Sequence, residues 1–142
     1  MNIKDFLIYP AIFTLNNDGS FTVAIRGWDD CVTEGKTYDE ALVMARSVIY
    51  DMAECLAGKE LIPQAVQAQK GDVLIDVGYD LAIKFMLRNV MLSDRWRITD
   101  LAKKLGVSKQ KIARNLDFSH ATKLDILRQF FDAIGHPLNI TC

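Results

Sequence analysis

Cysteine and proline are scarce in this chain of 142 residues, which contains three of each. The cysteines, Cys31, Cys55 and Cys142, are odd in number and lack the spacing of a metal site. We therefore expect reduced thiols, with no metal and no cofactor. No apolar run approaches the ~20 residues that span a membrane, and the first residues lack the order of a signal peptide. These absences predict a cytoplasmic protein without a membrane partner.

What the chain does contain is enough apolar sequence for a core and an uneven distribution of charge. Half of the residues are hydrophobic and a quarter are charged, which is typical of a folded globular protein. Residues 1–78 carry six basic and twelve acidic side chains, whereas residues 79–142 carry eleven basic and six acidic ones. We predict two domains that meet near Gly78. The acidic first domain suits a basic protein, and the basic second domain suits a polyanion.

The first domain is predicted to have the order β-β-β-α-β. Residues 8–15 and 20–26 alternate in hydrophobicity and are joined by the turn Asn16–Gly19, which is typical of an antiparallel hairpin. A short strand is expected at 31–34, a helix from the cap at Thr37 to Leu56, and a fourth strand at 73–77. This order indicates a small α+β domain of one sheet and one helix.

The stretch 98–116, ITDLAKKLGVSKQKIARNL, has the pattern of a helix-turn-helix. Apolar residues recur at helical spacing in both halves, Thr99 and Ser108 are the expected caps, and Gly106 suits a left-handed turn. Further helices are predicted at 80–92 and 122–134, and a short strand at 138–141. The second domain is therefore expected to be all-α.

The second helix of this pattern offers hydrogen-bond donors that phosphates and base edges accept. Its expected exposed positions are Lys109, Gln110, Lys111, Arg114 and Asn115. Gln110 is our choice for reading a base, and Thr99 for contacting a phosphate. A solvated polar face is the alternative interpretation. The predicted DNA-binding residues are Thr99, Ser108, Lys109, Gln110, Lys111 and Arg114.

The apolar side chains of the last predicted helix serve either the core or a dimer interface. They are Leu124, Leu127, Phe130, Phe131 and Ile134. Because helix-turn-helix proteins bind two half-sites as dimers, we expect a homo-oligomer formed through the second domain.

An ordered set of motifs in the chain resembles the HicB antitoxin family. The motifs are Tyr9-Pro10-Ala11, DGSFTV at 18–23, CVTEGKTYDEA at 31–41 and Ile62-Pro63, followed by the helix-turn-helix stretch. The resemblance spans residues 8–140, although Gly27–Asp30 departs from the proline-rich turn of the family. It implies a partial RNase H-like first domain and a helix-turn-helix second domain. It also implies an antitoxin that binds a HicA-like mRNA-degrading toxin and represses its own operon through operator DNA, and is not an enzyme.

Under this resemblance, the acidic first domain would cover the basic RNA-binding surface of the toxin. We expect Asp29, Asp30 and Glu34 to take part. Trp28, in the same segment, is either an exposed interface anchor or a core residue.

Two other functions remain open. Carboxylates of the first domain could form a metal-dependent nuclease site, although Asp51 and Glu54 fall on the polar side of the predicted helix and favour solvated charge. The second alternative is a stand-alone repressor whose first domain senses a small molecule. No glycine-rich phosphate loop supports it.

Overall fold

The computed structural model describes residues 2–138 and shows an α+β fold. Four antiparallel strands form one sheet in the order β3-β2-β1-β4. The short 3-10 helix η1 (Ile3–Phe6) precedes them. The strands are β1 (Ile8–Leu15), β2 (Phe21–Ile25), β3 (Val32–Gly35) and β4 (Val73–Asp76). The β-β-β-α-β order is confirmed, whereas the strand predicted at 138–141 falls almost entirely outside the described residues.

Strands β1 and β2 form the predicted hairpin. Leu15 pairs with Phe21, and Ala11 pairs with Ile25. In the turn, the Asn16 N–H donates to the Ser20 carbonyl at 2.8 Å. The hairpin places alternate residues on opposite faces of the sheet, so one face can be buried while the other stays open.

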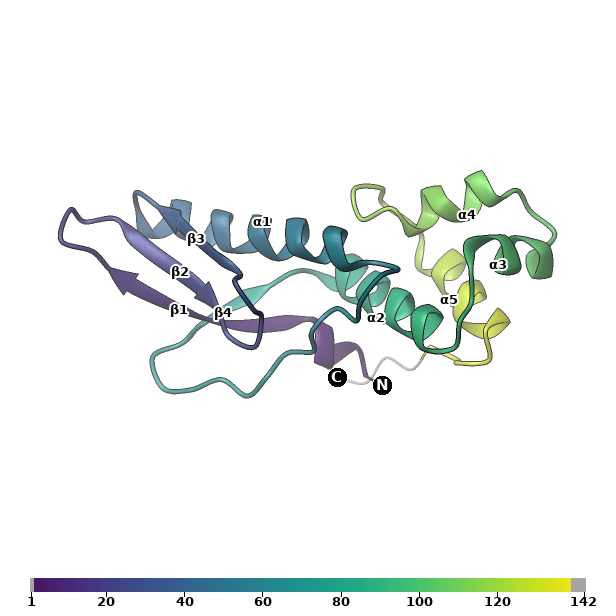
Figure 1. Cartoon of the computed structure of the whole chain (residues 1–142), viewed down its shortest axis with the longest axis horizontal. Coiled ribbons are helices and arrows are strands. Elements are labelled where there is room, and N and C mark those ends of the chain that lie inside the picture. The colour runs from purple at the N-terminus through teal and green to yellow at the C-terminus, as the bar shows by residue number, and fades with distance from the viewer. Residues whose placement is uncertain (1, 139–142) are drawn as a thin grey trace.

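Helix α1 (Tyr38–Leu56) covers one face of the sheet (Figure 1). It begins at Thr37, whose side chain accepts the Glu40 N–H at 3.1 Å. Small and apolar side chains line the contact from both sides, which brings helix and sheet close together. They are Ala41, Ala45, Ile49 and Ala53 from the helix and Tyr9, Ala11, Val23, Ile25 and Ile75 from the strands.

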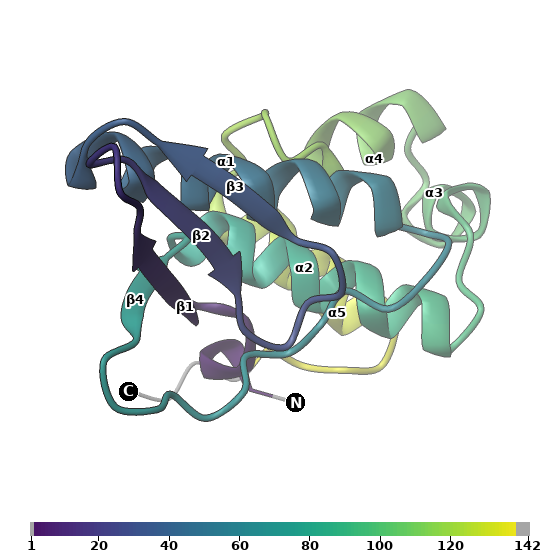
Figure 2. The ribbon, with the colours of Figure 1, turned by 60° about the vertical axis from the view of Figure 1, so that its left-hand side comes forward.

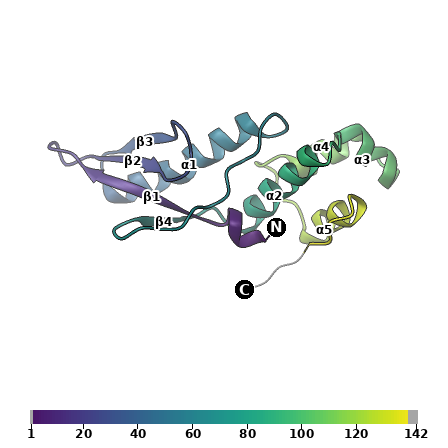
Figure 3. The ribbon, with the colours of Figure 1, turned by 60° about the horizontal axis from the view of Figure 1, so that its bottom comes forward.

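Four further helices group beyond one end of the sheet (Figure 3). Helix α2 (Tyr79–Ser93) is buried along most of its length and packs against both η1 and α5 (Leu124–Ala133). The side chain of Asn89 on α2 forms two hydrogen bonds of 2.8 Å with the backbone of Ile62, one to its N–H and one to its carbonyl. The buried apolar residues also form one cluster, and this cluster crosses the predicted boundary at Gly78. The helices are α2 (Tyr79–Ser93), α3 (Ile98–Leu105), α4 (Lys109–Leu116) and α5 (Leu124–Ala133).

Helix α5 serves the core. Phe130 and Phe131 are both buried, so they do not offer the dimer surface that the sequence left open. Leu124, at the start of the helix, is exposed instead. Within residues 2–138, every helix is too short or too polar to cross a membrane.

Candidate nucleic-acid interface and sheet surface

Helices α3 and α4 are joined by the tight turn that the sequence predicts. Gly106 adopts φ 67° and ψ 32°, a left-handed conformation that glycine tolerates without steric cost. The next N–H, that of Val107, donates to the Ala102 carbonyl at 3.1 Å. At the start of α4, the Ser108 side chain accepts the Lys111 N–H at 3.2 Å. The two helices, the glycine turn and the Ser108 cap are thus confirmed.

The prediction that Thr99 caps α3 is wrong, because the helix begins at Ile98, two residues earlier than a cap at Thr99 requires. Arg97 is the residue before the helix, and its N–H donates to the Asp100 carboxylate at 3.0 Å. The Arg97 guanidinium also contacts this carboxylate, and the hydrogen bond lowers the pKa of Asp100. Asp100 therefore satisfies the helix start from within the first turn, and Thr99 lies half-buried beside it.

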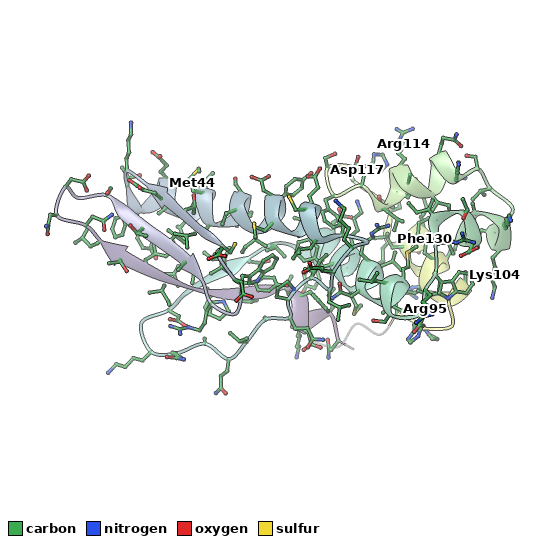
Figure 4. All side chains as sticks on the ribbon, in the orientation of Figure 1. Met44, Arg95, Lys104, Arg114, Asp117 and Phe130 are labelled. Atoms are coloured by element: carbon green, nitrogen blue, oxygen red, sulfur yellow. The ribbon has the colours of Figure 1, made fainter. Side chains whose placement is uncertain are left out.

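Helix α4 presents an exposed basic face. Lys109, Gln110, Lys111 and Arg114 are all exposed. Figure 4 shows the Arg114 side chain pointing away from the rest of the molecule. Within residues 2–138, the three cationic side chains of this set form no ion pair. Their donors are therefore available to an external acceptor.

Asn115 was expected on this face and is instead 7% exposed. Its side-chain amide donates to the Lys111 carbonyl at 3.0 Å, and its backbone carbonyl accepts the Thr122 hydroxyl at 2.9 Å. Asn115 is buried because its position around the helix axis places it beside Ile112 and Leu116, on the side of α4 that faces the core. Asn115 therefore ties the loop after α4 to the helix.

A buried lysine that sequence reasoning missed holds the same loop. The Lys84 side chain on α2 is fully buried, and its Nζ donates to the carbonyls of Asp117 and His120. It also lies 3.2 Å from the Asp80 carboxylate. The only signal in the sequence was an Asp–Lys pair at i, i+4, which usually indicates a solvated pair. His120 is thereby fixed beside Gln110, with which it lines a cavity of about 410 Å³.

The sheet face that α1 leaves free is seen in Figure 2, with the strands in front of the helix. Ala24 pairs with both Ile12 and Val32, so these side chains form a row across three strands. Ile12 and Val32 are exposed, as is Leu74 on β4. Glu34 lies on the same face, two residues beyond Val32. The result is an apolar strip with a carboxylate beside it.

Asp29 and Asp30 are exposed in the turn before β3, as expected, but Trp28 is not. Trp28 is 7% exposed, and its ring packs edge-on against Tyr9 with 5.4 Å between ring centroids. Its indole N–H is buried without a hydrogen-bond partner in the described residues. The structure thus resolves the two interpretations of Trp28 in favour of the core.

The carboxylates of the first half do not converge. Asp51 and Glu54 are exposed on the outer side of α1, as the periodicity indicated. Across residues 2–138, no three His, Cys, Asp or Glu side chains gather closely enough to hold a metal ion. Cys31 is buried, which raises the pKa of its thiol to about 11. This arrangement gives no support to the nuclease alternative.

Comparison with known proteins relates almost the whole chain to one group. It is 30% identical over 134 residues to Antitoxin HicB 1 of Photorhabdus laumondii, a match that covers 94% of this chain and 85% of the relative. It is 29% identical over 133 residues to Antitoxin HicB of Escherichia coli strain K12, covering 93% and 96%. Antitoxin HicB 2 of the same Photorhabdus strain is 30% identical over 133 residues, covering 93% and 94%. No family model matches the chain.

Proposed function

Because the chain belongs to the HicB antitoxin family, we propose that it neutralises a HicA-like mRNA-degrading toxin and represses its own operon. Both activities are binding events, and neither requires a cofactor. The observation that carries the proposal is the separation of charge along a chain of which 94% is related to antitoxins. The acidic half suits a toxin that must be basic where it holds RNA, and the basic half suits DNA.

In this proposal, residues 1–78 are a partial RNase H-like toxin-binding domain. Residues 79–142 are a helix-turn-helix domain in which α4 is the recognition helix. The left-handed turn at Gly106 and the Ser108 cap support this assignment of α3 and α4.

We infer that α4 enters the major groove of operator DNA with its exposed basic face. Gln110 reads a base, because a side-chain amide can pair with two groups of adenine. Lys109, Lys111 and Arg114 hold phosphates. The hydroxyls of Ser108 and Thr99 also contact phosphates in this proposal, since each residue lies at the start of a helix.

A dimer would place two copies of α4 on half-sites about 34–36 Å apart. Since Phe130 and Phe131 are buried in the core, another surface must form the dimer. Tyr79 and Leu124 are exposed and border one cavity of about 220 Å³ between α2 and α5. We propose that this apolar patch contributes to a homodimer.

We propose that the toxin binds the free face of the sheet. Specific interfaces combine an apolar centre with a polar rim. Here Ile12 and Val32 would form the centre, and Glu34 with the neighbouring Asp29 and Asp30 would form the rim. These carboxylates would steer a basic toxin and compete with the phosphates of its RNA substrate.

A pull-down of the full tagged chain from its native cells tests the proposal, with bound proteins identified by mass spectrometry after nuclease treatment. We expect a small basic ribonuclease to be retained. The Glu34→Lys variant should reduce its retention at least tenfold. Glu60→Lys reverses an exposed charge away from the strands and serves as the matched control. Retention of no protein, or equal retention by both variants, would contradict the proposed toxin surface.

A further inference from the structure

A cavity of about 790 Å³ lies between the turn that follows α1, the second half of α2 and the start of α3. This volume is within the range of pockets that hold small organic ligands. Its wall combines three arginines with apolar side chains. The arginines are Arg88, Arg95 and Arg97, and the apolar side chains are Met91, Leu92, Trp96 and Ile98. We name it the arginine cavity.

Arg88 is the unusual member of this set. It is half-buried on α2, and in the described part of the chain its guanidinium forms no hydrogen bond or ion pair. Burial lowers the pKa of Arg88. Glu54 lines an adjoining cavity that also reaches Arg88, yet the two do not pair. A charge that is taken out of water without a partner is unfavourable, and a bound anion would remove that cost.

The backbone leaves space for the Arg88 guanidinium. Gly58, in the turn after α1, has φ 78°, and a Cβ built on it would lie 2.5 Å from Nη2 of Arg88. Any other residue would therefore push the guanidinium away from its position.

The other charges of the arginine cavity are also positive. Arg95 is exposed and without an ion pair in the described residues, whereas Arg97 contacts Asp100. The Lys104 Nζ lies 5.4 Å from the centre of the Trp96 ring. Figure 4 places Arg95 and Lys104 on the side of the helical unit away from Arg114. The arginine cavity is therefore a second cationic region, separate from the exposed tip of Arg114.

We propose that the arginine cavity binds a small phosphorylated ligand that carries a planar ring, of the nucleotide class. Guanidinium groups match phosphate oxygens in charge and geometry, and the apolar wall with Trp96 suits a ring. Because the cavity includes the start of α3, a ligand there would bias the placement of α3 and α4. Ligand binding and DNA binding would then influence each other by the same factor. The proposal is independent of the toxin surface.

Isothermal titration calorimetry of the full chain tests this proposal. The probes are ATP, AMP and pyrophosphate, with citrate as an anion that has neither phosphorus nor a ring. We expect one saturable ATP site per chain and at least tenfold weaker binding of citrate. Arg88→Gln should weaken ATP binding at least tenfold. Arg128→Gln, the same change at an exposed position of α5 outside the cavity, should stay within twofold of the parent chain.

Thermal unfolding without ligand provides a second measurement. Arg88→Gln should unfold at the same or a higher temperature than the parent, because it removes an unpaired, half-buried charge. If that variant fails to fold, Arg95→Gln replaces it, since Arg95 is exposed. Absence of saturable nucleotide binding, or equal loss in the Arg88 and Arg128 variants, would overturn the proposal. So would a loss of DNA binding alone, which would assign these arginines to the DNA backbone.

Discussion

The Nζ of Lys84 lies 2.8 Å from the carbonyl oxygen of Asp117, 33 residues further along the chain. Asp117 is the residue that follows α4, so a buried cation of α2 binds at the negative end of the proposed recognition helix. The same Nζ donates to the carbonyl of His120. The end of α4 is thus attached to the most buried helix of the molecule.

Replacing Lys84 by Met should destabilise the protein by about 2–4 kcal/mol, because two partly buried carbonyls lose their donor and the Asp80 carboxylate loses its buried partner. Urea unfolding followed by circular dichroism measures this change. Lys123→Met, at an exposed position just before α5, is the matched control and should shift stability by less than about 0.5 kcal/mol. Equal effects of the two substitutions would mean that the contacts of Lys84 contribute nothing to the free energy of unfolding.

Trp28→Ala should cost about 3–5 kcal/mol of unfolding free energy, because it empties a large site beside Tyr9. Trp28→Phe keeps a ring and removes the unpartnered indole N–H, so its cost should be much smaller. Urea unfolding and toxin binding are measured on both variants. Weaker toxin binding at an unchanged free energy of unfolding would indicate that Trp28 belongs to the toxin interface instead of the core.

The Arg26–Asp72 ion pair predicts a pH dependence. Two hydrogen bonds of 2.8 Å join the guanidinium to the carboxylate, and they lower the pKa of Asp72 from its ordinary value of 3.8. The pair therefore stabilises the fold above about pH 4 and loses this effect as the pH falls through the lowered pKa. Asp72→Asn should be less stable than the parent at pH 7 and nearly equal to it near pH 2.

Unfolding by urea at several pH values checks this dependence. Glu60→Gln removes an exposed carboxylate and should give a difference from the parent that varies little with pH. A difference for Asp72→Asn that stays constant from pH 2 to pH 7 would contradict the role of the ion pair.

Substitutions on α4 should separate sequence reading from phosphate binding. Gln110→Ala should change the preference between operator variants by about 1–3 kcal/mol. Lys111→Ala should weaken binding to all sequences alike and reduce the salt dependence by about one released ion. Fluorescence anisotropy with DNA from the chain's own promoter, at several salt concentrations, measures both. An equal loss on every sequence for Gln110→Ala would refute its base-reading role.

The local features of the fold could be predicted from the sequence because they depend on neighbouring residues. The bounds of β1 follow from its β-branched and aromatic residues and the turn at Asn16–Gly19. The end of α3 follows from Gly106 and the start of α4 from Ser108, because the backbone preferences of both residues are local. Periodicity also placed Asp51 and Glu54 correctly on the outer side of α1.

The wrong cap at Thr99 is a local error, because only the start of α3 differs from the expectation. The other differences concern side chains whose environment comes partly from distant segments. Asn115 lies on the side of α4 that faces the core, where the Thr122 hydroxyl donates to its backbone carbonyl. Trp28, for which the sequence left two interpretations open, is buried against Tyr9. The burial of Lys84 depends on a loop more than thirty residues away. The arginine cavity could not be predicted either, because it joins Gly58 to residues near the start of α3.

The cluster of buried residues that continues from β4 into α2 has a consequence for how the gene can change. A chain terminated after the sheet would leave Ile3, Phe6 and Ile62 without the helix that now covers them. We expect such a fragment to aggregate or to be degraded. A mutation that ends the chain before α2 would therefore remove the proposed toxin-binding activity together with the proposed DNA-binding activity.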